Sequence, residues 1–238
     1  MTDAGCGSPE EGARGAHLLC DVKVRRTAMA RSIVYVVALG LVGLATAGCA
    51  DKRITVRYEP ATAMDTLTGA VPITIVQFAD RRGSEGDQDP YRVGGVYGGY
   101  GNRLSKIITD TSWQRTVVRA LAAGFRARGV ETATADDQEY KQGSAFATPL
   151  ALGGEIRNFS TESRWSTSAH ISGIVRLYDV KGTVLVEKTI SERETWGIGA
   201  GVLMAAEPLE ATLNKALEGF VRKVATDPEL SAQLTRRR

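Results

Sequence analysis

The sequence has the length and composition of one globular domain with appended segments. It contains 238 residues, of which 43% are hydrophobic and 24% charged, and its formal net charge is +3. This composition supports a single hydrophobic core. The small net charge lacks the broad basic field that is typical of proteins that bind nucleic acid. We therefore expect one domain and no nucleic-acid partner.

The N-terminal part of the sequence differs from the rest. Residues 1–28 are rich in glycine, mixed in charge and without hydrophobic periodicity, which indicates a disordered or mis-assigned extension with translation starting at Met1 or Met29. After Met29 and Arg31, a run of about 19 uncharged residues follows, long enough to approach the thickness of a bilayer. A short positive head before an apolar run is typical of a secretory signal peptide. We expect residues 29–48 to be a lipoprotein signal peptide.

The end of this apolar run, LATAGCA at residues 44–50, has three interpretations. Thr46-Ala47-Gly48-Cys49 resembles the bacterial lipobox, in which small residues precede a cysteine that is acylated and becomes residue one; here Thr46 stands where the usual pattern has leucine. Ala45-Thr46-Ala47 also fits the A-x-A site of an ordinary signal peptidase. An uncleaved membrane helix is the third reading. The lipobox is favoured because the small side chains and the thiol are in register.

Acylation of Cys49 would make the membrane the first partner of the chain. Two acyl chains, palmitate among them, are enough for stable anchoring, whereas one chain binds only marginally. Ala50 rather than aspartate follows the cysteine, which by analogy with enterobacterial sorting suggests the outer membrane, facing the periplasm. Cys6 and Cys20 precede any plausible cleavage site, so no disulfide is possible within the mature chain. We expect residues 49–70 to be the lipidated cysteine and a tether, with one edge strand near Ile54.

The domain proper is expected over residues 71–235. A β-branched run at residues 72–78 predicts a central strand. The following loop contains the glycine run 94–101, which lacks the spacing of a phosphate-binding loop. It predicts either a mobile or bulged hairpin with two tyrosines folded onto it, or a contact surface for a partner or a glycan, with Tyr97 and Tyr100 as stacking faces.

Two amphipathic helices and a β-meander complete the predicted elements. Thr111 and Gln114 fit a capping box before an apolar stripe that repeats every four residues and ends near Gly129. Pro208 fits the first position of a second amphipathic helix. Between the helices, alternating apolar residues predict strands over the following ranges. They are 150–159, 169–178 and 183–191, the last two joined by a turn at residues 179–182.

Catalytic and metal-binding signatures are lacking in the sequence. The predicted mature chain has one histidine, His170, in the centre of a predicted strand, and no nucleophile elbow accompanies it. A metal site needs several converging His, Cys, Asp or Glu side chains, which the sequence pattern does not provide. We expect no enzyme activity, no catalytic residues, no cofactor and no metal.

Several motifs together resemble the YajG-type family of uncharacterised bacterial lipoproteins. They are the strand ITIVQFADRR at residues 73–82, the glycine-tyrosine loop, the helix ending FRARGV at residues 125–130, the strand LGGEI at residues 152–156 and the hairpin LYDVKGTVL at residues 177–185. The resemblance implies a periplasm-facing accessory or binding module without known catalytic residues.

The sequence therefore predicts an α+β fold: a small antiparallel or mixed sheet with two amphipathic helices packed on one face. The expected function is that of a lipid-anchored, non-enzymatic envelope lipoprotein that binds an envelope protein partner. The alternative is an auxiliary lipoprotein of a transport or envelope-assembly system that handles lipid or another envelope ligand, for which we expect a cavity between the sheet and the helices.

Overall fold

The structure is a computed structural model. It describes residues 51–60, 64–83, 89–141, 146, 148–197 and 205–236. The N-terminal extension, the signal peptide and Cys49 lie outside the described residues. The unit that begins at Ala50 is compact in itself.

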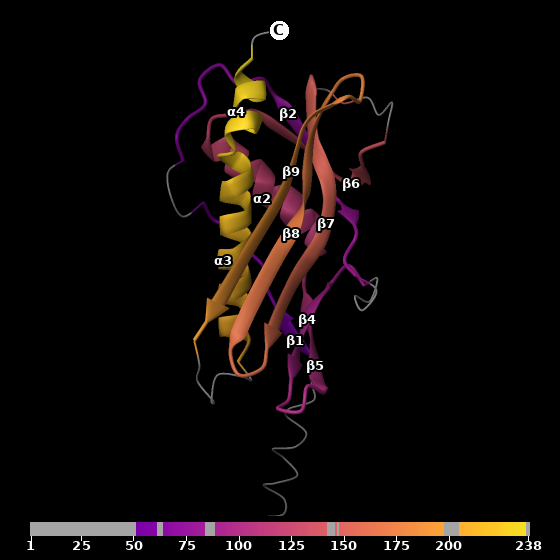
Figure 1. Cartoon of the computed structure of the whole chain (residues 1–238), viewed down its shortest axis with the longest axis vertical. Helices are drawn as coiled ribbons and strands as arrows, with labels where there is room; N and C mark the ends of the chain where they lie inside the picture. Colours follow the sequence, from indigo (N-terminus) through magenta and orange to yellow (C-terminus); the bar gives the residue numbers. More distant parts are fainter. Residues whose placement is uncertain are drawn as a thin grey trace, which may run out of the picture. The chain divides into compact units, whose positions relative to one another are not determined.

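One mixed sheet of nine strands dominates the described part of the chain (Figure 1). Its strands are β1 (Lys52–Ile54), β2 (Ile73–Gln77), β3 (Ala79–Asp80), β4 (Arg92–Tyr97), β5 (Arg103–Thr109), β6 (Thr132–Glu139), β7 (Leu150–Ser163), β8 (Thr167–Asp179) and β9 (Val184–Trp196).

Strand β7 is the branch point of this sheet. On one side it pairs over its whole length with β8, which pairs in turn with β9, both in antiparallel orientation. On its other side the first half pairs with β2 and β3, and the last residues pair with β4, all in parallel orientation. Strand β6 adds to β2, while β5 and β1 add to β4. The two smaller groups of strands therefore share one edge of β7.

The described part contains three helices: α2 (Trp113–Ala127), α3 (Ala206–Ala225) and α4 (Pro228–Thr235). Figure 1 shows α3 along β8 and β9, and α2 packs against β2 and β6. The two long helices also contact each other, so closely that a side-chain carbon at Gly124 would lie 2.4 Å from Val221. Fully buried apolar side chains, including Trp113, Phe125 and Phe220, fill the space between the helices and the sheet.

The structure confirms the predicted α+β class and the mixed sheet. Strand β2 is central, between β6 and β7, as its apolar run predicted. The alternating residues of β8, from Ala169 to Leu177, are buried on one face. The sheet is not small, because the glycine-rich segment forms β4 and β5, and because the polar residues of β6 form an edge strand without an apolar alternation.

The predicted helix starts were displaced. The cap of α2 is Ser112, one residue after the predicted Thr111, and its hydroxyl accepts a hydrogen bond from the Arg115 N–H at 3.4 Å. Gln114 does not close a capping box, since its buried Oε1 has no partner within the described residues. Helix α3 begins at Ala206, two residues before Pro208, so the proline lies in the first turn.

Much of the segment expected to be a tether packs against the domain. Ile54 of β1 is 1% exposed, and β1 pairs with β5. The Thr55 and Arg57 N–H groups donate to Glu210 and Asn214 on α3, at 3.1 and 3.0 Å. Further along, the Leu67 N–H donates to the Arg128 carbonyl at 2.8 Å. The described part of the domain thus includes residues from Asp51 onward, which were expected to form a tether.

Candidate functional site

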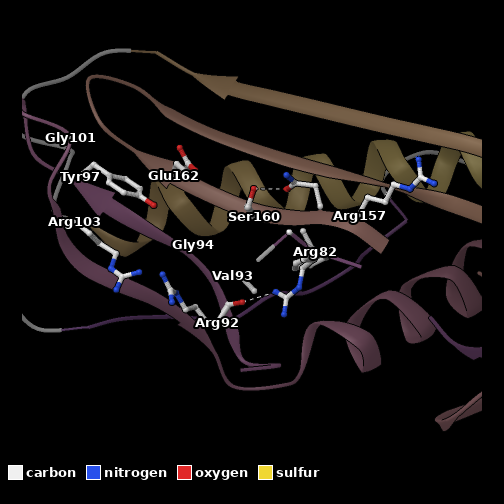
Figure 2. Close-up of a pocket in the computed structure, with 13 residues that line it drawn as sticks. Arg82, Arg92, Val93, Gly94, Tyr97, Gly101, Arg103, Arg157, Ser160 and Glu162 are labelled. Atoms are coloured by element: carbon white, nitrogen blue, oxygen red, sulfur yellow. Dashed lines mark hydrogen bonds between the residues drawn. The ribbon is translucent and has the colours of Figure 1, made fainter. Parts of the chain in front are cut away.

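A pocket lined by arginines lies where the sheet branches. Its volume is about 860 Å³, and it opens between the β4–β5 hairpin and the middle of β7 (Figure 2). The charged residues that line it are Arg82, Arg92, Arg103, Arg157 and Glu162. Tyr97, Asn158 and Ser160 add neutral polar groups, while Val93 and Phe159 add buried apolar ones.

Arg82 is held rigidly at one side of this pocket. Its guanidinium makes an ion pair with Asp80 at 2.9 Å and donates to the Arg92 carbonyl at 2.8 Å. The same group lies 4.8 Å from the centre of the Trp113 ring, a cation–π distance. With 10% of its side chain exposed, Arg82 connects the end of β3 to the start of β4. Its role is to fix the wall of the pocket.

A β-bulge in β7 shapes the opposite wall. Pairing between β7 and β8 shifts register between Ile156 and Asn158, which leaves Arg157 as the extra residue. Arg157 is exposed and pairs with Glu155 at 3.0 Å. The Ser160 hydroxyl and Asn158 Oδ1 lie 2.6 Å apart (Figure 2). The bulge therefore directs an arginine and a small polar pair to the same opening.

The third wall is the β4–β5 hairpin, and glycines allow its close approach to β7. Gly94 has a φ of +150°, and a side-chain carbon there would lie 1.8 Å from the Thr161 carbonyl oxygen. Residues other than glycine rarely adopt this backbone conformation, and the carbonyl leaves no room for one. The hairpin places Tyr97 opposite Arg103 in register, and both line the pocket. Gly94 is thus a structural requirement of the site.

One arginine of the pocket is available to an anionic ligand. Four arginines and one glutamate line the pocket, and the glutamate faces Arg164 at 4.0 Å. Arg82 and Arg157 are already paired with aspartate and glutamate side chains. Arg103 is exposed and has no ion-pair partner among the residues that the structure describes. Arginine binds carboxylate and phosphate groups through two parallel hydrogen bonds. The arrangement can therefore bind an anion, with Tyr97 and Ser160 as neutral hydrogen-bonding groups beside it.

The structure separates the two tyrosines that the sequence singled out. Tyr97 is half-buried in the pocket wall, with the Arg164 guanidinium 4.8 Å from its ring centre. Tyr100 is fully exposed, at 102%, in the turn that joins β4 to β5. The glycine segment is a bulged hairpin, as one interpretation held, but only one of its tyrosines folds onto it.

His170 lies on β8, opposite Ser160 of β7, which lines the arginine pocket. Its Nε2 is 3.1 Å from the Ser191 hydroxyl on β9. Partial burial, and secondarily the charge of Arg193, hold the pKa of His170 below its ordinary value. The histidine therefore lies between two serines, Ser191 on β9 and Ser160 opposite it on β7.

Among the described residues, no three His, Cys, Asp or Glu side chains are grouped in a way that could hold a metal ion. Within the same residues, no helix has the length and apolar character needed to cross a membrane.

The arginine pocket was not predicted from the sequence. Its arginines come from β4, β5, the bulge of β7 and the segment after β3, and they share no motif or spacing. The available signals were indirect: the paired arginines at positions 81 and 82, and the glycine run, which indicated a close backbone approach.

Comparisons with known proteins concern the fold. No family model matches the chain, and no curated protein matches it in sequence. The structure is similar to that of XCC0632 from Xanthomonas campestris, described as a DUF330 protein, with a TM-score of 0.51 and 12% identity over 77% of this chain and 95% of that one.

Weaker similarities extend to two other solved proteins. Lipoprotein GNA1162 from Neisseria meningitidis matches 60% of this chain and 97% of its own, with 15% identity and a TM-score of 0.31. PelC from Paraburkholderia phytofirmans, solved as a dodecamer, matches 66% of this chain and 93% of its own, with 14% identity and a TM-score of 0.35. At these levels of similarity, the comparisons establish one thing: the chain has the overall fold of XCC0632.

Proposed function

We propose that this chain is a lipid-anchored lipoprotein of the bacterial cell envelope, held at the outer membrane by acylated Cys49 and facing the periplasm. The lipobox-like sequence before Cys49 supports this proposal. We also propose that the chain is related to the YajG-type lipoproteins that its sequence motifs resemble.

Fatty-acid labelling tests the anchor directly. Cells that express the chain are grown with an alkyne fatty acid, and the purified protein is examined for label and for intact mass. We expect a labelled protein that begins at Cys49, and no label in Cys49→Ser. A mature chain that begins at Gly48 would favour the ordinary signal peptidase, and a retained leader would favour the uncleaved helix.

The proposed activity is non-enzymatic binding of an envelope protein through the arginine pocket. The observation behind it is Arg103, an exposed arginine without an ion-pair partner among the described residues, in an opening of about 860 Å³ that suits the carboxylates of an acidic protein segment. Tyr97 stands in the same wall and can pack against such a segment. Of the two tyrosines proposed as partner contacts, Tyr97 is the one that belongs to this site.

Photo-cross-linking in cells tests this site. A photoreactive residue replaces Tyr97, and the matched control carries it at Val180, which is 66% exposed in the β8–β9 turn. We expect a discrete protein adduct from position 97 that is lost when Arg103→Ala and Arg157→Ala are added. An absence of adduct above the Val180 background would count against a protein partner in the pocket.

The same pocket supports a second function, the handling of an anionic lipid or another envelope ligand. Arginine forks suit phosphate as well as carboxylate. The space between the sheet and the helices, where the sequence led us to expect a cavity for this role, is filled by core side chains. Titration calorimetry with water-soluble dihexanoyl phosphatidic acid separates the two functions. Saturable binding that Arg103→Ala weakens would favour the lipid, and no heat of binding would disfavour it.

A further inference from the structure

Two turns and one strand end meet at one end of the sheet. Val96 of β4 pairs with Ser163 at the end of β7, Ser163 with Thr167 at the start of β8, and Thr167 with Trp196 at the end of β9. The β4–β5 turn, the β7–β8 turn and the last residue of β9 therefore lie side by side at this end of the sheet. Figure 1 shows these strand ends together, opposite the β8–β9 turn.

Large exposed aromatic side chains lie at this end of the sheet. Tyr100 is 102% exposed, Trp165 is 71% exposed and Trp196 is 49% exposed. Trp165 and the β4–β5 turn are in contact, since a side-chain carbon at Gly99 would lie 3.4 Å from the Trp165 ring. We call Tyr100, Trp165 and Trp196 the aromatic tip. Aromatic side chains that stabilise a hydrophobic core are buried. Three exposed aromatic side chains at one end of the sheet therefore indicate a contact surface.

The predicted lipidation site is tied to the same end. Strand β1 is parallel to β5, with Lys52 opposite Ile107, so the chain before Lys52 runs toward the β4–β5 turn. Asp51 fixes this direction, because its carboxylate accepts a hydrogen bond from the Lys106 N–H at 3.1 Å. Cys49 precedes Asp51 by two residues and can lie no more than about 7 Å from it. An acyl chain on Cys49 would hold this end of the domain next to the bilayer.

From this geometry we infer that the aromatic tip docks into the interface of the bilayer that holds the anchor. The inference rests on the proposed lipidation of Cys49. Tryptophan and tyrosine are favoured at membrane interfaces, where an apolar ring with a polar group suits the headgroup region. Arg164 beside the tip is opposed by Glu162 at 4.0 Å, whereas the exposed Arg103 next to the turn has no ion-pair partner among the described residues. We assign the docking to the rings, so that it takes place on neutral lipid as well.

This orientation also directs the arginine pocket. Tyr97 and Arg103 line the pocket and immediately flank the β4–β5 turn that presents Tyr100. If the tip rests in the interface, the pocket opens beside the headgroups rather than far out in the periplasm. The anchor, the tip and the pocket then form one continuous membrane-proximal face.

Tryptophan fluorescence of the full acylated chain tests the docking. The chain is reconstituted in phosphatidylcholine vesicles whose acyl chains are brominated near the headgroup, because bromine quenches only rings that enter the bilayer. The chain has three tryptophans, and Trp113 is fully buried in the core. We expect quenching of the wild-type emission, and none in the Trp165→Phe, Trp196→Phe double variant, which retains Trp113 as the internal control.

A tryptophan at the opposite end provides the matched control. Val180→Trp in the double variant places an exposed ring in the β8–β9 turn, and we expect it to remain unquenched. Intact mass reports acylation of Cys49 in each sample. An acylated chain without quenching would overturn the docking and leave the lipoprotein proposal standing. An unacylated chain would overturn both, and shielding of Trp165 that depends on protein concentration and not on lipid would indicate a second copy and overturn the docking.

Discussion

Two pairs of arginines in this domain have opposite environments. Arg128 and Arg82 are largely buried, with 7% of the first residue and 10% of the second side chain exposed, and both donate to backbone carbonyls. Arg103 and Arg157 are exposed in the wall of the pocket, and only Arg157 has an ion-pair partner among the described residues. The same side chain thus serves the fold in the first pair, while in the second pair it faces solvent and, at Arg103, is available to a ligand.

The difference follows from the groups to which each guanidinium donates hydrogen bonds. Arg128 is the C-cap of α2, and its side chain reaches the end of α3, where the helix leaves carbonyl groups without partners, and donates to the Ala225 carbonyl there. Arg82 similarly satisfies the carbonyl at the start of β4. Arg103 satisfies no backbone group among the described residues. Substitution of the buried arginines should therefore lower stability, and substitution of the exposed arginines should lower binding alone; the comparison can be tested by substituting each in turn.

The largest effect is expected for Arg128→Ala. The change removes hydrogen bonds to Asp65, Ala225 and Ser231 and leaves buried carbonyl oxygens without a donor. We expect the free energy of unfolding to fall by about 3 kcal/mol. Urea unfolding followed by circular dichroism measures it. Arg119→Ala is the control, because the exposed pair with Asp136 at 3.5 Å should contribute less than about 1 kcal/mol. Equal losses in the two variants would contradict the comparison.

A smaller loss of stability is expected for Arg82→Ala. The variant loses the Asp80 ion pair, the bond to the Arg92 carbonyl and the contact with the Trp113 ring. We expect a decrease of about 2 kcal/mol in the free energy of unfolding, together with weaker ligand binding, because the pocket wall is no longer fixed. Thermal unfolding and the Tyr97 cross-link report the two effects. An unchanged Tm in Arg82→Ala would mean that Arg82 contributes as little to stability as the exposed Arg103 and Arg157, and would contradict the comparison.

The exposed pair should affect binding alone. In the Arg103→Ala, Arg157→Ala double variant we expect the free energy of unfolding to stay within about 0.5 kcal/mol of the original. The yield of the Tyr97 adduct should fall at least about tenfold, since a charge-assisted hydrogen bond contributes roughly 1.5–3 kcal/mol. Arg222→Ala, an exposed arginine on α3, should leave both quantities unchanged. A clear decrease in the free energy of unfolding of the double variant would contradict the distinction between the buried and the exposed arginines.

The buried parts of the fold were the predictable ones. The apolar stripe from Trp113 to Phe125 and the alternation along β8 follow directly from burial on one face, and both were identified. Strand β6 was missed because an edge strand in a parallel pair needs no apolar alternation. The arginine pocket was missed for another reason: it depends on a bulge at Arg157 and a close approach at Gly94, which are properties of the assembled sheet.

The smallest effect concerns pH, where His170 differs from the arginines because it can lose its charge near neutrality. Its pKa is lowered in the folded state by burial and by Arg193, so the unfolded chain binds a proton more readily. Stability from this residue is therefore complete above the ordinary pKa of about 6.5 and declines as the pH falls below it. We expect His170→Gln to weaken this acid-side decline in urea unfolding. Binding at the arginine pocket should stay constant between pH 8 and pH 6 for a ligand that does not titrate there, because arginine remains charged throughout. A parallel fall in binding would mean that the strand pair of His170 and the pocket are coupled through β7, and that the two arginine environments are not independent.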